Sequence, residues 1–197
     1  MILYTDTETT GLYPGQIVQL TYIMQTEKDV TAKNMFFAVP FVDPGAVAVH
    51  GFSAEKLKVL SGGKVFSDYA DEIEKDFSSA DVVVSHNVSF DEAFLRAEFE
   101  RVGKILPIKN SFCSMKNTVP ICKLLRSGGR GYKYPKLSEL CDFFGVTERE
   151  TEETARKLFG IDSAFYHDAR FDTAAVFLAM NYGMRSEELL SELKKYL

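Results

Sequence analysis

Three short acidic segments, spread over almost the whole chain, constrain its fold more than any other feature. They are Asp6–Gly11, His86–Asp91 and His167–Asp172. Four of their carboxylates and one histidine make chemical sense as a single group and little sense apart. We therefore expect a fold that gathers these distant segments at one site, where two divalent cations can hold the carboxylates together.

The first segment continues a short apolar strand pattern at the N-terminus. Side chains alternate along a strand, so Ile2, Tyr4, Asp6 and Glu8 share one face. Carboxylates two positions apart start ~6.5–7 Å from each other. At ~5 Å they repel by ~3 kcal/mol at an effective dielectric of ~20, and a cation or a bound proton relieves that repulsion. The alternative is a solvated strand end with both acids exposed.

The second segment joins a strand to a helix. Asp81–Ser85 is rich in β-branched residues and has the length of a strand. Ser89 and Glu92 have the spacing of a helix capping box, which places Asp91 in the first helical turn. The helix dipole alone accounts for an acid there, and His86–Asn87 is equally typical of a turn.

The third segment opens a helix with an apolar face formed by Phe171, Ala175, Leu178 and Tyr182. Asp172 heads an adjoining apolar row, and acids are seldom buried without a partner. His167 precedes the helix on a loop, where an imidazole can turn toward a cavity. A lone histidine is more often structural, but one so near that acid favours a functional role.

The three segments together resemble the motifs of the DEDDh exonucleases, a family that includes the proofreading epsilon subunits of bacterial replicative polymerases. The matching patterns are Asp6-x-Glu8-x-x-Gly11, His86-Asn87-x-x-Phe90-Asp91 and His167-Asp168-Ala169-x-x-Asp172. Val49-His50-Gly51 is similar to an element between the family's first two motifs. The likeness runs from Met1 to about Tyr182. The sister "y" form would need tyrosine at position 168, where this chain has aspartate.

The resemblance implies hydrolysis of phosphodiester bonds at a 3′ end, with release of nucleoside 5′-monophosphates. Two divalent cations, Mg²⁺ or Mn²⁺, are implied as cofactors, held by the carboxylates of Asp6, Glu8, Asp91 and Asp172. Glu8 and His167 are the implied catalytic residues, with His167 as the general base. The unperturbed imidazole pKa of ~6.5 suits a base near neutral pH.

The resemblance also implies substrate contacts around the terminal nucleotide. These are Thr9, Gly11 and Leu12 after the first motif, and Val49, His50, Asn87 and Phe90 elsewhere. Leu12 and Phe90 can equally be core residues.

Basic residues are unevenly distributed along this acidic chain. The net charge is −5, yet the window from Arg101 to Ser138 holds nine basic residues and no acid, which leaves −14 on the remainder. Within it, Arg126–Lys136 interleaves basic and aromatic residues, a composition typical of single-strand binding. We expect Arg126, Arg130 and Lys133 to contact nucleic acid. The alternative is a solvated loop that aids solubility.

Hydrophobic periodicity predicts an α/β fold, and the resemblance implies a ribonuclease H-like, mixed five-stranded sheet flanked by helices. A single exonuclease domain over residues 1–197 is expected. The predicted strands are Ile2–Thr7, Gln16–Gln25, Met35–Val39, Val82–Ser85 and a segment around Ser111–Ser114. The predicted helices are Ser53–Leu60, Asp68–Ser78, Phe90–Val102, Asn117–Leu125, Leu137–Phe144, Glu148–Leu158, Ala169–Tyr182 and Ser186–Tyr196.

The segment Thr147–Tyr166 is longer than in the compact epsilon type, and we expect it to add a helix beside His167 that gates or repositions that residue. Three cysteines without CxxC spacing, and the lack of a charged leader or long apolar run, predict a reduced, cytoplasmic protein without a membrane span. Expected partners are single-stranded nucleic acid 3′ ends and a DNA polymerase or repair complex. DNA is favoured over RNA, and the alternatives are an exoribonuclease or a catalytically silent accessory subunit.

Overall fold

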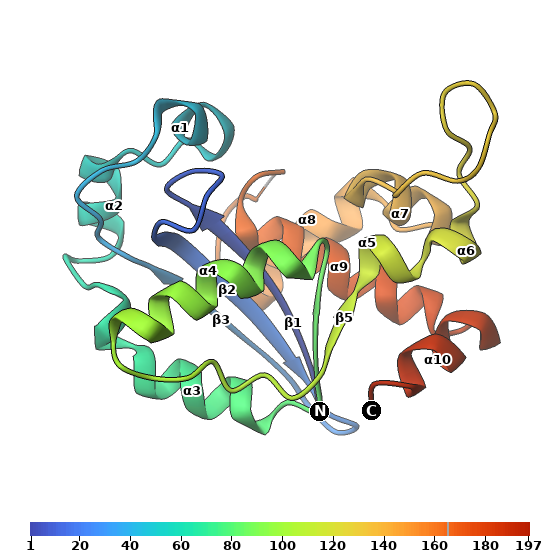
Figure 1. Ribbon diagram of the computed structural model, residues 1–197, viewed down its shortest axis with the longest axis horizontal. Coiled ribbons are helices and arrows are strands. Elements are labelled where there is room, and N and C mark those ends of the chain that lie inside the picture. Colours follow the sequence, from blue (N-terminus) through green and yellow to red (C-terminus); the bar gives the residue numbers. More distant parts are fainter. Residues whose placement is uncertain (165) are drawn as a thin grey trace.

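A five-stranded mixed sheet forms the centre of the computed structural model, which describes residues 1–164 and 166–197 (Figure 1). The strand order is β3-β2-β1-β4-β5. β1 pairs antiparallel with β2 and parallel with β4, β2 pairs antiparallel with β3, and β4 pairs parallel with β5. The strands are β1 (Ile2–Thr9), β2 (Ile17–Gln25), β3 (Val30–Phe36), β4 (Val82–Ser85) and β5 (Ser111–Cys113). The predicted fold class is confirmed.

Helices cover both faces of this sheet. They are α1 (Pro44–His50), α2 (Ala54–Leu60), α3 (Ala70–Ser79), α4 (Val88–Arg101), α5 (Ser114–Asn117), α6 (Val119–Cys122), α7 (Leu137–Phe144), α8 (Glu148–Phe159), α9 (Ala169–Gly183) and α10 (Glu187–Lys194). In Figure 1, α3 and α4 lie in front of the sheet, whereas α8 and α9 lie behind it. Among the described residues, no helix is long and apolar enough to cross a bilayer.

Alternation along β1 divides the core between these two layers. Leu3 packs into the cluster formed with α3 and α4, whereas Tyr4 packs into the cluster formed with α9 and α10. Because side chains repeat every second residue, Asp6 and Glu8 fall on the same face as Tyr4, the face that α9 covers. The N-terminal turn of α9 therefore meets the last residues of β1.

The third strand differs from its prediction. The apolar run Met35–Val39 was expected as a strand, but β3 is the polar stretch Val30–Phe36. This strand lies at the edge of the sheet, where one side stays solvated and apolar alternation is not required. Phe37 and Val39 are buried instead as side chains of the segment that leaves the sheet.

The helices also differ from the predictions in three respects. Ser89 and Glu92 do not form a capping box, because α4 begins at Val88 after Asn87, whose φ of 80° is left-handed. The helix predicted at Asn117–Leu125 is shortened to α6. It is separate from α5, since Pro120 has no amide hydrogen to continue a helical ladder from that helix. Helix α1 was not anticipated at all; Asp43 caps it and Pro44 opens it.

A buried glutamate on α4 ties the β1–β2 connection to the core. Glu98 is 3% exposed, and its Oε1 accepts a hydrogen bond from the Ile17 amide at 2.8 Å. Arg101 pairs with Glu98 at 2.8 Å and also donates to the Gly15 carbonyl. This arrangement fixes the far end of the loop that carries Gly11 and Leu12.

Replacing Glu98 by Ala is expected to destabilise the protein by about 2–4 kcal/mol, because the buried Ile17 amide and the Arg101 charge lose their partner. Glu98→Gln keeps an amide oxygen for Ile17 and should cost less. Urea denaturation of both variants measures the difference. Equal stability of Glu98→Ala and the wild type would contradict the anchoring role.

Candidate active site

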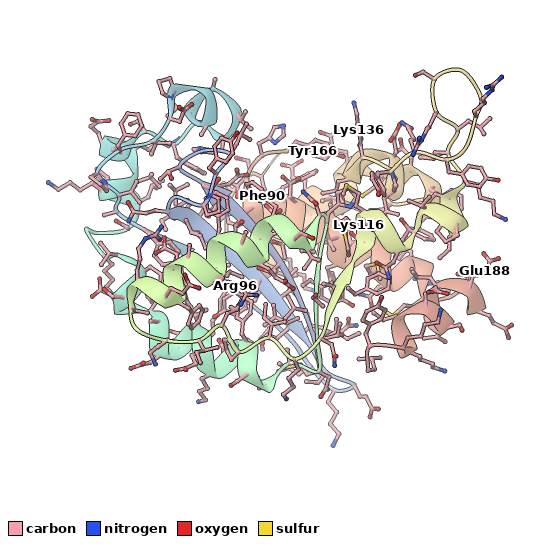
Figure 2. All side chains as sticks on the ribbon, in the orientation of Figure 1. Phe90, Arg96, Lys116, Lys136, Tyr166 and Glu188 are labelled. Atoms are coloured by element: carbon pink, nitrogen blue, oxygen red, sulfur yellow. The ribbon has the colours of Figure 1, made fainter. Side chains whose placement is uncertain are left out.

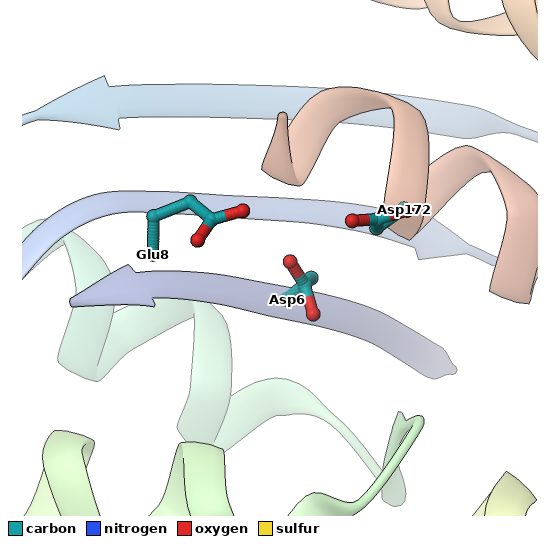
Figure 3. A group of neighbouring side chains, drawn as sticks. All are labelled: Asp6, Glu8 and Asp172. Carbon is teal, nitrogen blue, oxygen red and sulfur yellow. The ribbon is translucent and has the colours of Figure 1, made fainter. Parts of the chain in front are cut away.

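Three carboxylates from two elements meet beside the sheet. Asp6 and Glu8 project from β1, and Asp172 projects from the first turn of α9 (Figure 3). One oxygen from each lies within 4.8 Å of the others. Oxygen-only donor sets of this kind suit hard divalent cations such as Mg²⁺ and Mn²⁺.

The position of Asp172 depends on how α9 is anchored to β2. Gln19 on β2 donates from Nε2 to Asp168 at 3.1 Å and accepts from the Ala169 amide at 3.2 Å. Asp168 also caps α9 and forms an ion pair with Arg170, whose guanidinium lies over the Phe36 ring. These contacts hold the first turn of α9 against the sheet.

One oxygen of Asp172 is left without a partner. Oδ2 accepts a hydrogen bond from the His167 amide at 3.1 Å, whereas Oδ1 is buried and has no hydrogen-bond donor among the described residues. A buried carboxylate oxygen without a donor is costly unless a cation or a proton satisfies it. The donor set and this free oxygen therefore fit a divalent cation held by Asp6, Glu8 and Asp172.

Burial raises the pKa of every acid of the cluster, and the charges of neighbouring acids add to the shift for Asp6 and Glu8. Burial, together with the nearby Asp91 and Asp172 charges, raises the pKa of Asp6 well above its usual range. Burial and the Asp172 charge raise the pKa of Glu8 to about 9, and burial raises the pKa of Asp172 to about 7. The cluster thus favours either bound protons or bound cations at neutral pH.

Asp91 is close to the cluster but is held differently. It is buried in the first turn of α4, and its two oxygens accept hydrogen bonds from the hydroxyls of Thr7, at 2.8 Å, and Ser85. Burial raises its pKa to about 6, although these two hydrogen bonds oppose the shift. Thr7 faces away from Asp6 on β1, so Asp91 approaches the strand end from the α4 side. Its oxygens do not belong to the three-carboxylate group.

His167 lies on the turn immediately before α9. Its φ of 65° is left-handed, its amide is bonded to Asp172, and its side chain is exposed. It lines a cavity of about 560 Å³ with both Asp6 and Asp172. The imidazole thus stands at the mouth of the acidic cluster. The expected helix of the preceding segment is α8, which packs against α9.

Most of the predicted substrate residues line a second cavity of about 330 Å³. Its wall includes Glu8 of the cluster together with Thr9, Gly11, Leu12, Val49, His50 and Phe90. Leu12 is 85% exposed, so the alternative that it is a core residue is wrong. Phe90 packs against the core and also lines the cavity. Asn87 is not part of this wall; it is the residue immediately before α4, and its side chain makes no capping hydrogen bond.

His50 is held as a neutral imidazole. Nδ1 accepts from the Phe52 amide at 3.1 Å, so the proton resides on Nε2, which donates to the Thr9 carbonyl at 3.1 Å. Burial lowers its pKa. His50 therefore supports the cavity wall without carrying charge.

The three predicted nucleic-acid contacts of the basic loop, Arg126, Arg130 and Lys133, line neither cavity. Between α6 and α7 the chain extends outward as a long loop (Figure 1), closed by a bridge between Leu125 and Tyr132. Arg126 donates to the Tyr132 carbonyl at 2.9 Å, and Lys133 pairs with Glu139. Arg130 is exposed near the tip.

The basic window of the sequence does not form one surface. Arg101 ends α4 on the side of the molecule opposite the α6–α7 loop (Figure 1), and it pairs with Glu98. Lys104 pairs with Asp71 and Glu74 near α3. The basic residues that are consecutive in this window are therefore not gathered on one surface of the folded protein.

Several residues that build the site were missed by sequence reasoning. Gln19, Thr7 and Ser85 position the acids, and Lys136 lines the larger cavity. The alternation of β1 could have singled out Thr7, since it places the Thr7 side chain on the other face of the sheet from Asp6. Nothing in the sequence marks Gln19, because its importance comes from contacts with distant segments. Lys136 was predicted only as part of the basic and aromatic stretch Arg126–Lys136, not as a residue beside the acids.

A ribonuclease H-like sheet with acids gathered at the end of its first strand defines a nuclease class, and the comparisons agree. Residues 3–176 match the RNase_T family model, described as an exonuclease. The DNA polymerase III subunit epsilon of Salmonella typhimurium is 30% identical over 191 residues, covering 92% of this chain and 71% of that protein. The chain therefore belongs to this family of 3′–5′ exonucleases, as the motifs predicted.

Two further relatives extend the comparison. The 3′–5′ exonuclease DinG of Bacillus subtilis is 26% identical over 137 residues, which cover 68% of this chain and 14% of that protein. A zinc-bound complex of E. coli ExoI with single-stranded DNA superposes with a TM-score of 0.74 at 18% identity. It covers 98% of this chain, which spans 42% of the ExoI chain, and supports the fold alone.

The metal-free protein is expected to lose stability as pH rises. The pKa values of Glu8 and Asp172 are raised on folding, so their ionisation opposes the folded state between about pH 4 and pH 9. Asp172→Asn removes one charge and should stabilise the metal-free protein by about 1–3 kcal/mol at pH 8. Mg²⁺ or Mn²⁺ should stabilise the wild type and not the variant.

Thermal melting in chelator and in each cation, from about pH 5 to pH 9, measures these effects. Asp162→Asn, at an exposed acid outside the cluster, is the matched control. A pH-independent melting temperature in chelator would contradict the electrostatic assignment.

Proposed function

We propose that this protein degrades single-stranded DNA from its 3′ end, releasing nucleoside 5′-monophosphates, with two divalent cations, Mg²⁺ or Mn²⁺. The observation that carries the proposal is the group of Asp6, Glu8 and Asp172, with its unpartnered Asp172 oxygen. Residues 1–197 are proposed to act as one exonuclease domain. A cytoplasmic setting beside a polymerase or repair complex follows from the epsilon relatives, which are named as DNA polymerase subunits.

Each acid has a proposed role at the scissile phosphate. Asp6 would hold both cations, Glu8 and Asp172 would help to hold the one that activates the attacking water, and Asp91 would support the other. The bound cations would shield phosphate charge, activate water and stabilise the leaving alkoxide. Asp91 would act directly or through water, since each of its oxygens accepts one hydrogen bond, from Thr7 or Ser85, and keeps a second lone pair.

His167 is the proposed general base. One of its imidazole nitrogens takes the proton as the water oxygen attacks phosphorus, and the P–O3′ bond breaks. The departing 3′ oxygen then takes a proton from solvent. The exposed imidazole at the mouth of the cavity and the tie between its amide and Asp172 support this role.

The cavity beside Glu8 is the proposed seat of the terminal nucleoside. Its volume of about 330 Å³ and apolar side chains Leu12, Val49 and Phe90 suit a base and sugar. The DNA preference rests on the relatives, whose names include DNA polymerase subunits and an ExoI–ssDNA complex. The loop residues Arg126, Arg130 and Lys133 are proposed to contact the strand farther from the cut.

The proposed activity is tested with 3′- and 5′-labelled single-stranded DNA and RNA in Mg²⁺, Mn²⁺ or chelator. Stepwise shortening from the 3′ end that stops in chelator is expected, with DNA degraded faster than RNA. Equal decay in chelator would reject the cation mechanism. Faster decay of RNA would favour the exoribonuclease alternative, and no decay of either would favour a silent accessory subunit.

His167→Ala is expected to lower kcat by about 10²–10⁴-fold, because a general base contributes about that factor. Cation affinity should change little, since the bond to Asp172 comes from the residue 167 amide and survives the substitution. Single-turnover kinetics and Mn²⁺ titration measure the two quantities. A large loss of Mn²⁺ affinity would mean that the imidazole is a cation ligand instead.

A further inference from the structure

The carboxylate cluster separates two cavities of different character. Glu8 lines the smaller, largely apolar cavity, whereas Asp6 and Asp172 line the larger one. The larger cavity is bounded by polar and charged side chains, including those of His86, Lys136 and Ser138. A phosphodiester at the cluster therefore has distinct surroundings on its two sides.

A 3′-exonuclease must accommodate both products of the cut. If the terminal nucleoside occupies the apolar cavity, the rest of the strand leaves through the polar one. That departing strand carries a phosphate close to the scissile group, in a region dominated by Asp6, Asp91 and Asp172. The two proposed cations would compensate the acids of the cluster, and a further positive charge on the cavity wall would attract this second phosphate.

Lys136 is placed to supply that positive charge. It is exposed on the wall of the polar cavity, and its ammonium has no ion-pair or hydrogen-bond partner within the described part of the chain. Figure 2 shows Lys136 and Tyr166 at the same upper edge of the molecule, with Phe90 lower on α4. A free ammonium beside a cluster of acids is available for a ligand.

The other basic groups of this cavity are less suitable. His86 has both ring nitrogens engaged, by the Ser114 hydroxyl at 3.0 Å and the Pro135 carbonyl at 3.1 Å. Burial lowers its pKa to about 4, so it carries no charge at neutral pH. His167 is already assigned to the attacking water.

The backbone at Lys136 is fixed, although its side chain is free. Its amide donates to Glu139 Oε2 at 2.8 Å at the start of α7, and the preceding Pro135 is buried. Leu137 packs into two core clusters. Because this backbone is already fixed, little backbone entropy is lost when the Lys136 ammonium binds an anion.

We propose that Lys136 binds the phosphate of the next linkage on the 5′ side of the one being cut, and so sets the path of the departing strand. The inference rests on the proposed function and adds a positioning contact to it. Beyond Lys136 the strand continues toward the α6–α7 loop, where Arg130 is exposed.

Two substrates separate this contact from the chemistry. A single-stranded oligodeoxynucleotide has the second phosphate, whereas the p-nitrophenyl ester of thymidine 5′-monophosphate has only the scissile one. Lys136→Ala should lower kcat/KM for the oligonucleotide about ten-fold, as expected for one lost phosphate contact, and reduce the salt dependence of KM by about one counterion. Its effect on the ester should be much smaller, and Lys136→Arg should restore oligonucleotide cleavage.

Lys28→Ala is the charge-matched control, because Lys28 is exposed in the β2–β3 turn. A substrate with a neutral methylphosphonate at the second linkage completes a double-mutant cycle. On this substrate, kcat/KM of the wild type should fall by about the same factor as the Lys136→Ala substitution lowers kcat/KM on the natural oligonucleotide. For Lys136→Ala, kcat/KM should be no lower on the methylphosphonate substrate than on the natural oligonucleotide.

The Lys136 assignment would be overturned if Lys136→Ala lowered kcat/KM equally for the oligonucleotide and the ester. It would also be overturned if the effects of the substitution and of the methylphosphonate were additive. Either result would leave the exonuclease proposal intact. Unchanged oligonucleotide cleavage by Lys136→Ala would overturn the assignment in the same way. If the wild type cleaves neither substrate with Mg²⁺ or Mn²⁺, the proposed function fails, and this inference fails with it.

Discussion

The repulsion among closely placed carboxylates is the constraint on which the rest of this structure depends. Asp6, Glu8 and Asp172 bring three oxygens within 4.8 Å, and Asp91 adds a fourth charge nearby. Such a group raises the free energy of the folded chain unless protons or cations compensate. Its persistence therefore requires a scaffold that resists separation of the acids, which the sheet and the two helices α4 and α9 supply.

That scaffold works from both sides of one strand. On the α9 side, Gln19 and Asp168 hold the helix that carries Asp172 against β2. On the α4 side, the hydroxyls of Thr7 and Ser85 hold Asp91 at the ends of two parallel neighbours, β1 and β4. These short-range hydrogen bonds thus offset part of the electrostatic cost. They leave Oδ1 of Asp172 without a donor and available to a cation.

The predictable part of the site was the part governed by local periodicity. Alternation alone places Asp6 and Glu8 on one face, and helical spacing places Asp172 at the head of α9. The bounds predicted for the edge strand β3 were wrong because its polar residues pair through the backbone. The capping box predicted for α4 was wrong because Asn87 adopts a left-handed conformation that side-chain patterns do not encode. Gln19 was not predicted, and Lys136 was predicted only within a basic stretch, because tertiary contacts alone place them beside the acids.

The amide of His167 and the carboxylate of Asp172 are joined by one hydrogen bond across a single tight turn. A shift of the Asp172 carboxylate toward a cation would therefore displace the His167 backbone amide that is bonded to it. Loading of the acidic centre and orientation of the ring are mechanically linked through five residues of chain. On the proposed assignment of His167 as the proton acceptor, cation binding by Asp172 and the position of that acceptor are coupled through this hydrogen bond.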